Sequence, residues 1–163
     1  MMSPALPLGN LSPNFAKAEF VASEYAARKG IDNTPPILTW ENLWALATTV
    51  LEPARTALGP IRISSGFRCE ALNRAIGGAR ASQHLTGEAA DLIPLRASLG
   101  ELLRWIVGNA PFDQVIYEFG QWVHVSHVRA PGMQRGSILI ATKDARNRTR
   151  YAPLSEEGVA ALL

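Results

Sequence analysis

Apolar residues recur at the spacing of a helix along the first half of the chain. This spacing predicts a helix within 16–28 that stops at Gly30, and a second helix that begins behind Thr39 as its N-cap. Pro53 should kink or divide the second helix, because proline cannot donate the helical hydrogen bond, and the Gly-Pro pair at 59–60 should end it.

The second half carries short apolar runs and stretches in which apolar and polar residues alternate. These patterns predict strands at 61–64, 91–93, 114–118, 122–126 and 137–141. Two helices lie between them, a short one that ends at 77–78 and a longer one over 99–107 that Ser98 caps. Helices first and hairpin-linked strands last predict an α+β fold, with a mainly antiparallel sheet flanked by helices.

Length and composition are those of a globular protein. The chain has 163 residues, of which 47% are hydrophobic and 18% charged, enough to bury a sizeable core. We therefore expect a single monomeric domain over 1–163, with an extended segment at 1–16, where prolines and a glycine occur. The single cysteine, Cys69, excludes an internal disulfide and fits a reducing compartment.

The formal net charge of +2 is too small to indicate a nucleic-acid partner. Basic residues do gather late in the chain, and a polyanion such as a bacterial wall would attract them, although a solvated basic face is the commoner explanation. These residues are Arg129, Arg135, Lys143, Arg146, Arg148 and Arg150. No apolar run is long enough to span a bilayer, so we expect no membrane insertion.

The clearest candidate chemistry is a histidine, His84, followed seven residues later by an aspartate, Asp91. Imidazole nitrogen and carboxylate oxygen both suit zinc. On spacing alone, a surface histidine in a polar loop and an aspartate leading into a strand are the better explanation, because two ligands do not make a site. A catalytic zinc site needs a third protein ligand and one open position for water.

The strand at 122–126 offers that third ligand. Alternation places Val123 and Val125 on the core face, so His124 faces the other way. His84, Asp91 and His124 could then hold one zinc ion, whereas His127 is out of phase and is a poor candidate.

Several short motifs follow one another in order: S-x-G-F-R at 64–68, Asn73, G-G at 77–78, S-x-H-x-x-G-x-A-x-D at 82–91 and W-x-H-x-S at 122–126. Together they resemble the zinc D-alanyl-D-alanine carboxypeptidase family, which includes phage L-alanyl-D-glutamate endolysins and shares its fold with the hedgehog signalling domain. The opening is similar to the short phage and prophage branch, in L-S-x-N-F at 11–15 and G-I-D-N-x-P at 30–35.

The resemblance implies one catalytic zinc on His84, Asp91 and His124, and a substrate drawn from the stem peptides of peptidoglycan. It also implies that Arg68 and Ser82 lie near the substrate. Trp122, which is close to His124 on the same strand, would lie near the substrate as well. A guanidinium suits a carboxylate or a developing oxyanion, although a buried salt bridge would also explain Arg68. Ser82 could merely cap the turn that follows it.

Two positions in the sequence have to be considered for the general base, Gln121 and Glu118. Many members of the family carry an acidic residue three positions before the last histidine, where this chain has Gln121. Glu118, six positions before, resembles the hedgehog-type arrangement. A two-residue turn would put Glu118 on the face of Val123, whereas a three-residue or bulged loop puts it on the face of His124. We predict the longer loop, and an exposed hairpin-end carboxylate is the alternative.

Two other carboxylates are weaker candidates for the base. Asp113 is expected to cap or turn the chain rather than react, and Glu88 is expected to be exposed.

Two functions follow from these residues. The first is a peptidoglycan hydrolase with Glu118 as base, which cuts the L-Ala–D-Glu or the D-Ala–D-Ala bond in phage lysis or, by the same chemistry, in bacterial wall remodelling. The second is a non-catalytic zinc domain that binds wall peptide or another protein. Residues 1–10 lack the features of a signal peptide, so we expect synthesis in the bacterial cytoplasm and delivery by a holin-type or other route.

Overall fold

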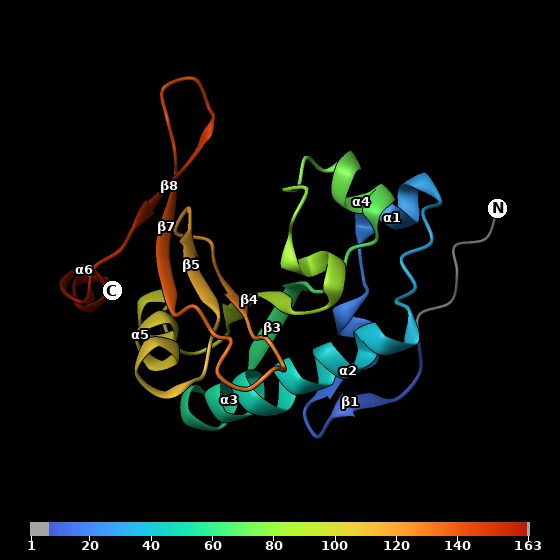
Figure 1. The fold of residues 1–163 in the computed structure, drawn as a ribbon, viewed down its shortest axis with the longest axis horizontal. Helices are drawn as coiled ribbons and strands as arrows, with labels where there is room; N and C mark the ends of the chain where they lie inside the picture. Colours follow the sequence, from blue (N-terminus) through green and yellow to red (C-terminus); the bar gives the residue numbers. More distant parts are fainter. Residues whose placement is uncertain (1–6, 163) are drawn as a thin grey trace.

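The computed structural model describes residues 7–162 (Figure 1). Its first elements are β1 (Asn10–Ser12), β2 (Phe15–Ala16), the 3-10 helix η1 (Lys17–Phe20) and α1 (Glu24–Lys29). The single helix predicted within 16–28 is therefore wrong. Ser23 starts a new helix by accepting a hydrogen bond from the N–H of Ala26, and Gly30 ends it in a left-handed conformation as expected. Of the expected extended segment, 1–6 lie outside the described residues.

A long continuous helix follows, made of α2 (Ile37–Leu46), the π-helical η2 (Ala47–Leu51) and α3 (Glu52–Leu58). It begins behind Pro36, whose φ of −58° already suits a helix entry, so the N-cap predicted at Thr39 is wrong. The N–H of Glu52 donates to a carbonyl five residues back, and this wide turn carries Pro53 into the helix. Gly59 ends the helix with a φ of +88°.

Six strands form the main sheet: β3 (Ile61–Ser65), β4 (Ala89–Pro94), β5 (Gln114–Glu118), β6 (Trp122–Ser126), β7 (Ser137–Lys143) and β8 (Thr149–Pro153). They lie in the order β3-β4-β6-β5-β7-β8. All neighbours are antiparallel except β5 and β7, which run parallel. The predicted α+β fold with a mainly antiparallel sheet is thus confirmed, and β8 is an addition that the sequence pattern did not indicate.

The remaining helices are α4 (Glu70–Ala75), the 3-10 helix η3 (Gln83–Thr86), α5 (Leu99–Asn109) and α6 (Glu156–Ala161). Ser98 caps α5 as predicted, in a capping box with Glu101. Among the described residues, no helix combines the length and the apolar character needed to cross a bilayer.

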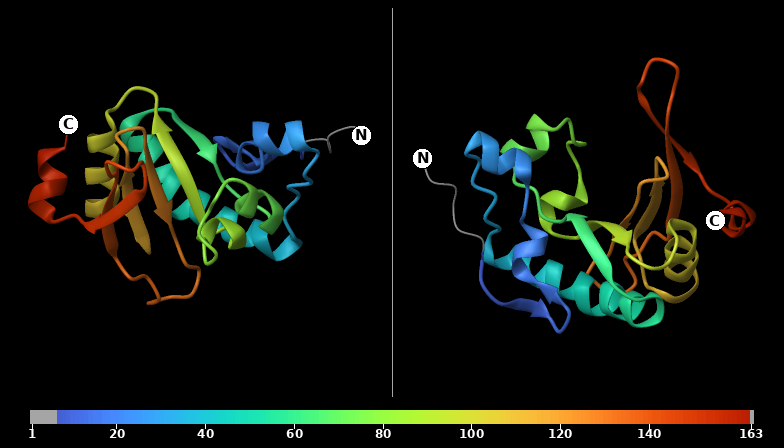
Figure 2. Two further views of the ribbon diagram at one scale, coloured as in Figure 1. Left: turned by 90° about the horizontal axis from the view of Figure 1, so that it is seen from above. Right: turned by 180° about the vertical axis from the view of Figure 1, so that it is seen from behind.

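The two faces of the sheet have different neighbours (Figures 1 and 2). The long helix and α5 cover one face, where fully buried side chains form the core: Leu43, Leu46, Val50, Leu51, Leu102, Leu103, Ile106, Val115, Val123 and Val125. On the other face, the segment with α4 and η3 rises on one side and the β7–β8 hairpin on the other (Figure 1). The polar residues of the candidate site lie on this second face.

Candidate metal centre and active site

Two of the three predicted ligands lie opposite each other on neighbouring strands. Asp91 on β4 pairs with His124 on β6, and the Nδ1 atom of His124 is 2.9 Å from Oδ1 of Asp91. Val123 and Val125 are fully buried in the core, as the alternation predicted. Because side chains alternate across a strand, His124 faces the opposite side of the sheet.

The third predicted ligand comes from η3. The side chain of Ser82 caps this helix by accepting a hydrogen bond from the N–H of His84, and Gly87 ends it with a φ of +73°. A Cβ atom at Gly87 would lie 2.5 Å from Thr39, so the close approach of η3 to α2 requires glycine here. This short helix brings Nε2 of His84 to 3.3 Å from Oδ1 of Asp91.

The three side chains together form a buried donor set. Their ligand atoms all lie within 4.8 Å of one another, and the residues are only 3%, 5% and 7% exposed. The Nδ1 atom of His84 lies 2.6 Å from the carbonyl oxygen of Gly66. That contact holds the ring with a proton on Nδ1 and leaves the Nε2 lone pair for a metal.

The protonation states of His84 and Asp91 also suit a metal. Burial lowers the pKa of His84 below its usual value, which favours the neutral imidazole. Burial acts against ionisation of Asp91, but the two histidines outweigh it and hold the pKa of this carboxyl far below its usual range. Neutral imidazoles and an ionised carboxylate are the forms that bind metal, so the residues present fit a zinc ion.

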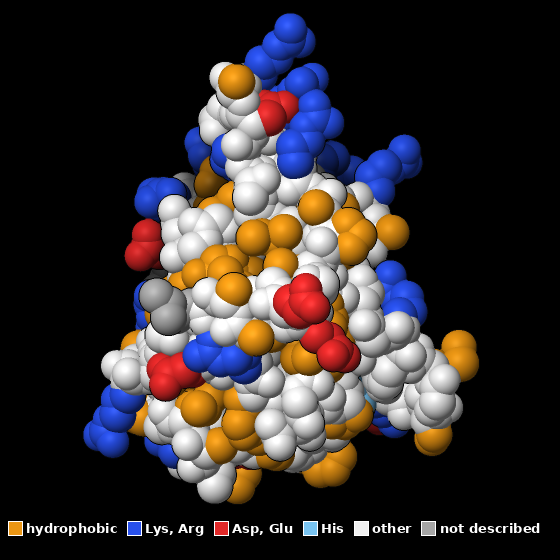
Figure 3. Space-filling view, turned by 90° about the vertical axis from the view of Figure 1, so that its left-hand side faces the viewer, with side chains coloured by type: hydrophobic (Ala, Val, Ile, Leu, Met, Phe, Trp, Pro, Cys, Tyr) orange, Lys and Arg blue, Asp and Glu red, His pale blue; other side chains and the backbone are white. Residues whose placement is uncertain are grey.

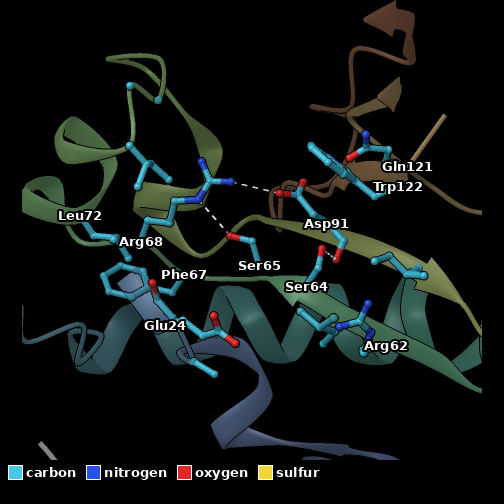
Figure 4. A pocket seen from close by; sticks show the side chains of 17 residues that line it. Glu24, Arg62, Ser64, Ser65, Phe67, Arg68, Leu72, Asp91, Gln121 and Trp122 are labelled. Atoms are coloured by element: carbon cyan, nitrogen blue, oxygen red, sulfur yellow. Dashed lines mark hydrogen bonds and ion pairs between the residues drawn. The ribbon is translucent and has the colours of Figure 1, made fainter. Parts of the chain in front are cut away.

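Arg68 contacts the second oxygen of the same carboxylate. Its Nη2 atom donates to Oδ2 of Asp91 at 3.0 Å, and its Nε atom donates to Oγ of Ser65 at 3.0 Å (Figure 4). The salt bridge that was the alternative explanation for Arg68 is therefore present. Arg68 also lines the cavity in front of the donor set. The side chain can therefore form this ion pair and still face the cavity.

Glu118 lies on the same face of the sheet as His124. It pairs with Trp122 across a loop of three residues, 119–121, in which Phe119 and Gly120 have positive φ values of 55° and 66°. The predicted three-residue loop is thus confirmed. Burial, followed by the charge of Asp91, raises the pKa of the Glu118 carboxyl above its ordinary value.

A cavity of about 520 Å³ joins these groups. The three candidate ligands, Arg68, Ser82, Glu118 and Trp122 all line it, so every predicted site residue meets in one place. A buried His-Asp-His donor set beside a carboxylate in a cleft is an arrangement for hydrolysis with a metal ion.

A match to a known protein family supports the conclusion that the site hydrolyses a substrate with a metal ion. The sequence pattern of the peptidase M15 family matches residues 13–126, well over half of the chain. The chain belongs to the peptidase M15 family. It is a metallopeptidase whose candidate metal ligands are His84, Asp91 and His124. No curated protein gives a significant match to the chain.

Three residues that line the cavity of this M15 peptidase lie outside the matched region, Arg135, Leu139 and Tyr151. Tyr151 on β8 is level with Ala141 on β7, which is level with Glu118 on β5, so the three lie in one row on one face. Tyr151 is 58% exposed, but partial burial of its hydroxyl, and then the charges of Glu118 and Asp91, raise the pKa of this group. The sequence pattern missed Tyr151 because its position depends on the parallel pairing of β5 and β7.

The weaker candidates have structural partners instead. His127 lies outside the donor set, and its Nδ1 atom is 2.6 Å from the carbonyl oxygen of Pro111. Glu88 is partly buried, not exposed as expected, and accepts a hydrogen bond from the hydroxyl of Thr86.

Asp113 is buried and accepts hydrogen bonds from the backbone and guanidinium of Arg135 and from the side chain of Gln83. Asp113 therefore connects the segments of Gln83 and Arg135 beside the cleft. This is a structural role, as expected, and not a reactive one.

The late basic residues are largely paired. Arg129 contacts Glu41 and Arg135 contacts Asp113, while Arg148 and Arg150 share Asp144 on the β7–β8 hairpin. Basic side chains gather at the projecting end of this hairpin (Figure 3). These ion pairs favour the explanation of a solvated basic face.

Proposed function

We propose that this M15 peptidase hydrolyses a bond in the stem peptides of peptidoglycan, using one zinc ion held by His84, Asp91 and His124. The observation that carries the proposal is the position of Glu118, which lines the same cavity as this buried donor set. A wall- or protein-binding zinc domain would need no carboxylate there. The arrangement therefore supports a hydrolase over a binding domain.

Each residue has a role in that reaction. When bound, zinc lowers the pKa of a water molecule towards neutrality and polarises a carbonyl group. Glu118 accepts a proton from the attacking water and passes it to the nitrogen of the leaving amine, so that one water is consumed as the C–N bond breaks.

Other side chains orient the peptide. Arg68 holds Asp91 in place and turns its remaining N–H groups towards a substrate oxygen. Ser82 and Trp122, which also line the cavity, contact the peptide. The hydroxyl of Tyr151, which lies in the same row of the sheet as Glu118, donates a hydrogen bond to the substrate.

The bond is L-Ala–D-Glu or D-Ala–D-Ala, and the proposed setting is lysis by a phage or prophage. The whole chain, 1–163, acts as one monomeric peptidase domain in this proposal, with no nucleic-acid partner.

Digestion of purified peptidoglycan tests the proposal. The zinc-loaded protein should release fragments whose masses carry one added water, and a chelator should stop the release. An L-Ala–D-Glu cut leaves a new amino group on D-Glu, whereas a D-Ala–D-Ala cut frees D-alanine. If zinc-loaded protein binds peptidoglycan of several chemotypes and cleaves none, the binding domain replaces the hydrolase.

A further inference from the structure

The cleft continues beyond the metal centre into a second and larger hollow. This hollow has a volume of about 870 Å³, and Arg62, Arg68, Asp91 and Trp122 are among the residues that line it (Figure 4). Residues that line both spaces are Arg68, Gly77, Gly78, Asp91 and Trp122. Because the two spaces share these residues, the second hollow offers room for the continuation of a peptide held at the metal centre.

A row of paired strand residues connects the second hollow to the candidate base. Arg62 on β3 pairs with Ile93 on β4. The register of β4 with β6 puts Ile93 level with Trp122, which pairs with Glu118. Adjacent strands lie about 4.8 Å apart, so the backbone of Arg62 is about 10 Å from that of Trp122, on the same face of the sheet.

Arg62 is the uncommitted cation of this hollow. Its side chain is exposed, and within residues 7–162 its guanidinium has no hydrogen-bond or ion-pair partner. Arg68, by contrast, is bonded to Asp91 and Ser65. The carboxylate on the rim, Glu24, is 95% exposed and lies 3.8 Å from Arg28.

The rest of the floor is neutral or already bonded. Ile93 is apolar, and the hydroxyl of Ser64 donates to the backbone carbonyl of Asp91. A planar guanidinium standing alone in a cleft is suited to a carboxylate, which it can bind through two parallel hydrogen bonds.

We propose that the second hollow is a substrate subsite in which Arg62 binds a carboxylate of the peptide while the scissile bond lies at the metal centre. This inference rests on the proposed function, because it takes the cleft as a peptide site. Arg62 is one strand across and two residues along from the candidate ligand Asp91, a backbone separation of about 8 Å, which an extended chain spans in about two to three residues. The preferred substrate is therefore an acidic peptide with a carboxylate about two to three residues from the cut.

The test compares two forms of one substrate. A soluble stem peptide is prepared with free carboxyl groups and with the same groups amidated, and both are cleaved by the wild type and by Arg62→Gln. We expect Arg62→Gln to raise the KM of the acidic peptide about tenfold and to leave that of the amidated peptide unchanged. The kcat should change for neither. Singly amidated peptides then identify the carboxylate.

Arg146→Gln is the matched control, since it removes the same charge from an exposed position on the β7–β8 hairpin. It should change neither KM. If Arg62→Gln alters both peptides alike, or neither, the subsite is wrong. Should Arg62→Gln fail to fold, Arg62→Lys keeps the charge without the fork and should raise the KM of the acidic peptide alone.

Calorimetry separates this inference from the proposed function. If the wild type cleaves neither peptide, the proposed function fails, but the affinity of the protein for each peptide still tests the subsite. Tighter binding of the acidic peptide that Arg62→Gln abolishes supports the subsite. Equal affinity for both peptides overturns it.

Discussion

Glu118 lies directly opposite Trp122 across the β5–β6 hairpin, and the loop of three residues between them turns both side chains to the face that carries His124. A two-residue turn would have paired Glu118 with Gln121 and sent the carboxylate towards the core. A single residue of loop length therefore decides whether a carboxylate faces the candidate metal ligands. Gln121, at the position that is acidic in many relatives, is exposed at the hairpin end.

The donor set predicts how metal content responds to mutation. His84→Ala, Asp91→Ala and His124→Ala should each bring bound zinc from about one per chain to near zero after dialysis, because a site with two protein ligands holds zinc weakly. Elemental analysis by mass spectrometry measures the content. His127→Ala is the control and should keep its zinc, since this ring contacts Pro111 instead. Full zinc in His84→Ala would show that the site is elsewhere.

Arg68→Lys separates the two roles of this side chain. Lysine keeps the positive charge near Asp91 but loses the planar fork. We expect kcat to fall about a hundredfold, with zinc content and melting temperature little changed. A loss of melting temperature as severe as the loss of turnover would mean that Arg68 serves mainly as an ion pair.

Tyr151→Phe tests the contribution of the C-terminal hairpin to the cleft. Removal of the hydroxyl should lower kcat/KM about tenfold, the effect of one lost hydrogen bond to the substrate. Tyr117→Phe removes the same hydroxyl from the opposite face of the sheet, where Tyr117 packs against the core. Steady-state rates of the two variants should differ clearly. Equal rates would exclude Tyr151 from the substrate site.

Asp113→Asn tests a structural ion pair next to the cleft. Burial opposes ionisation of Asp113, but hydrogen bonds from Arg135 outweigh it and lower the pKa of this carboxyl. A group whose pKa is lower in the folded protein stabilises it above the unfolded pKa of about 4, and this stability is lost as the pH falls through the folded value. Asp113→Asn should therefore lower the melting temperature most near neutral pH.

The difference between wild type and Asp113→Asn should shrink as the pH falls below about 4. Thermal melts across pH 2–8 by circular dichroism measure it. The same substitution at Asp144, which lies on the projecting hairpin between Arg148 and Arg150, should have a smaller effect. A difference that stays constant with pH would contradict the lowered pKa.

Local chemistry was enough to predict part of this structure. Ser98 and Glu101 form the capping box that starts α5, and the alternation in 122–126 separates the core valines from His124. The three candidate ligands could be found because two of them follow local patterns, and the family motifs supply the rest. Each of these predictions depends on residues close together in the chain.

The features that were missed depend on competition or on distant contacts. Pro36 starts α2 in place of Thr39, because its fixed φ suits the entry to a helix. The parallel pairing of β5 with β7 joins segments about twenty residues apart, and no local pattern specifies it. Tyr151 reaches the cleft only through that pairing, so no spacing in the sequence could indicate its role.

Glu118→Gln tests the central claim most directly, because it removes the proton acceptor while keeping the size of the side chain. Zinc content and melting temperature should hardly change, and the rate of peptidoglycan cleavage should fall by at least about a hundredfold. Gln121→Ala, the matched change at the other end of the loop, should cost far less. The measurement is the cleavage rate per zinc-loaded molecule for wild type and both variants. A hundredfold loss confined to Glu118→Gln is the predicted result, and near-wild-type cleavage by that variant would contradict the account.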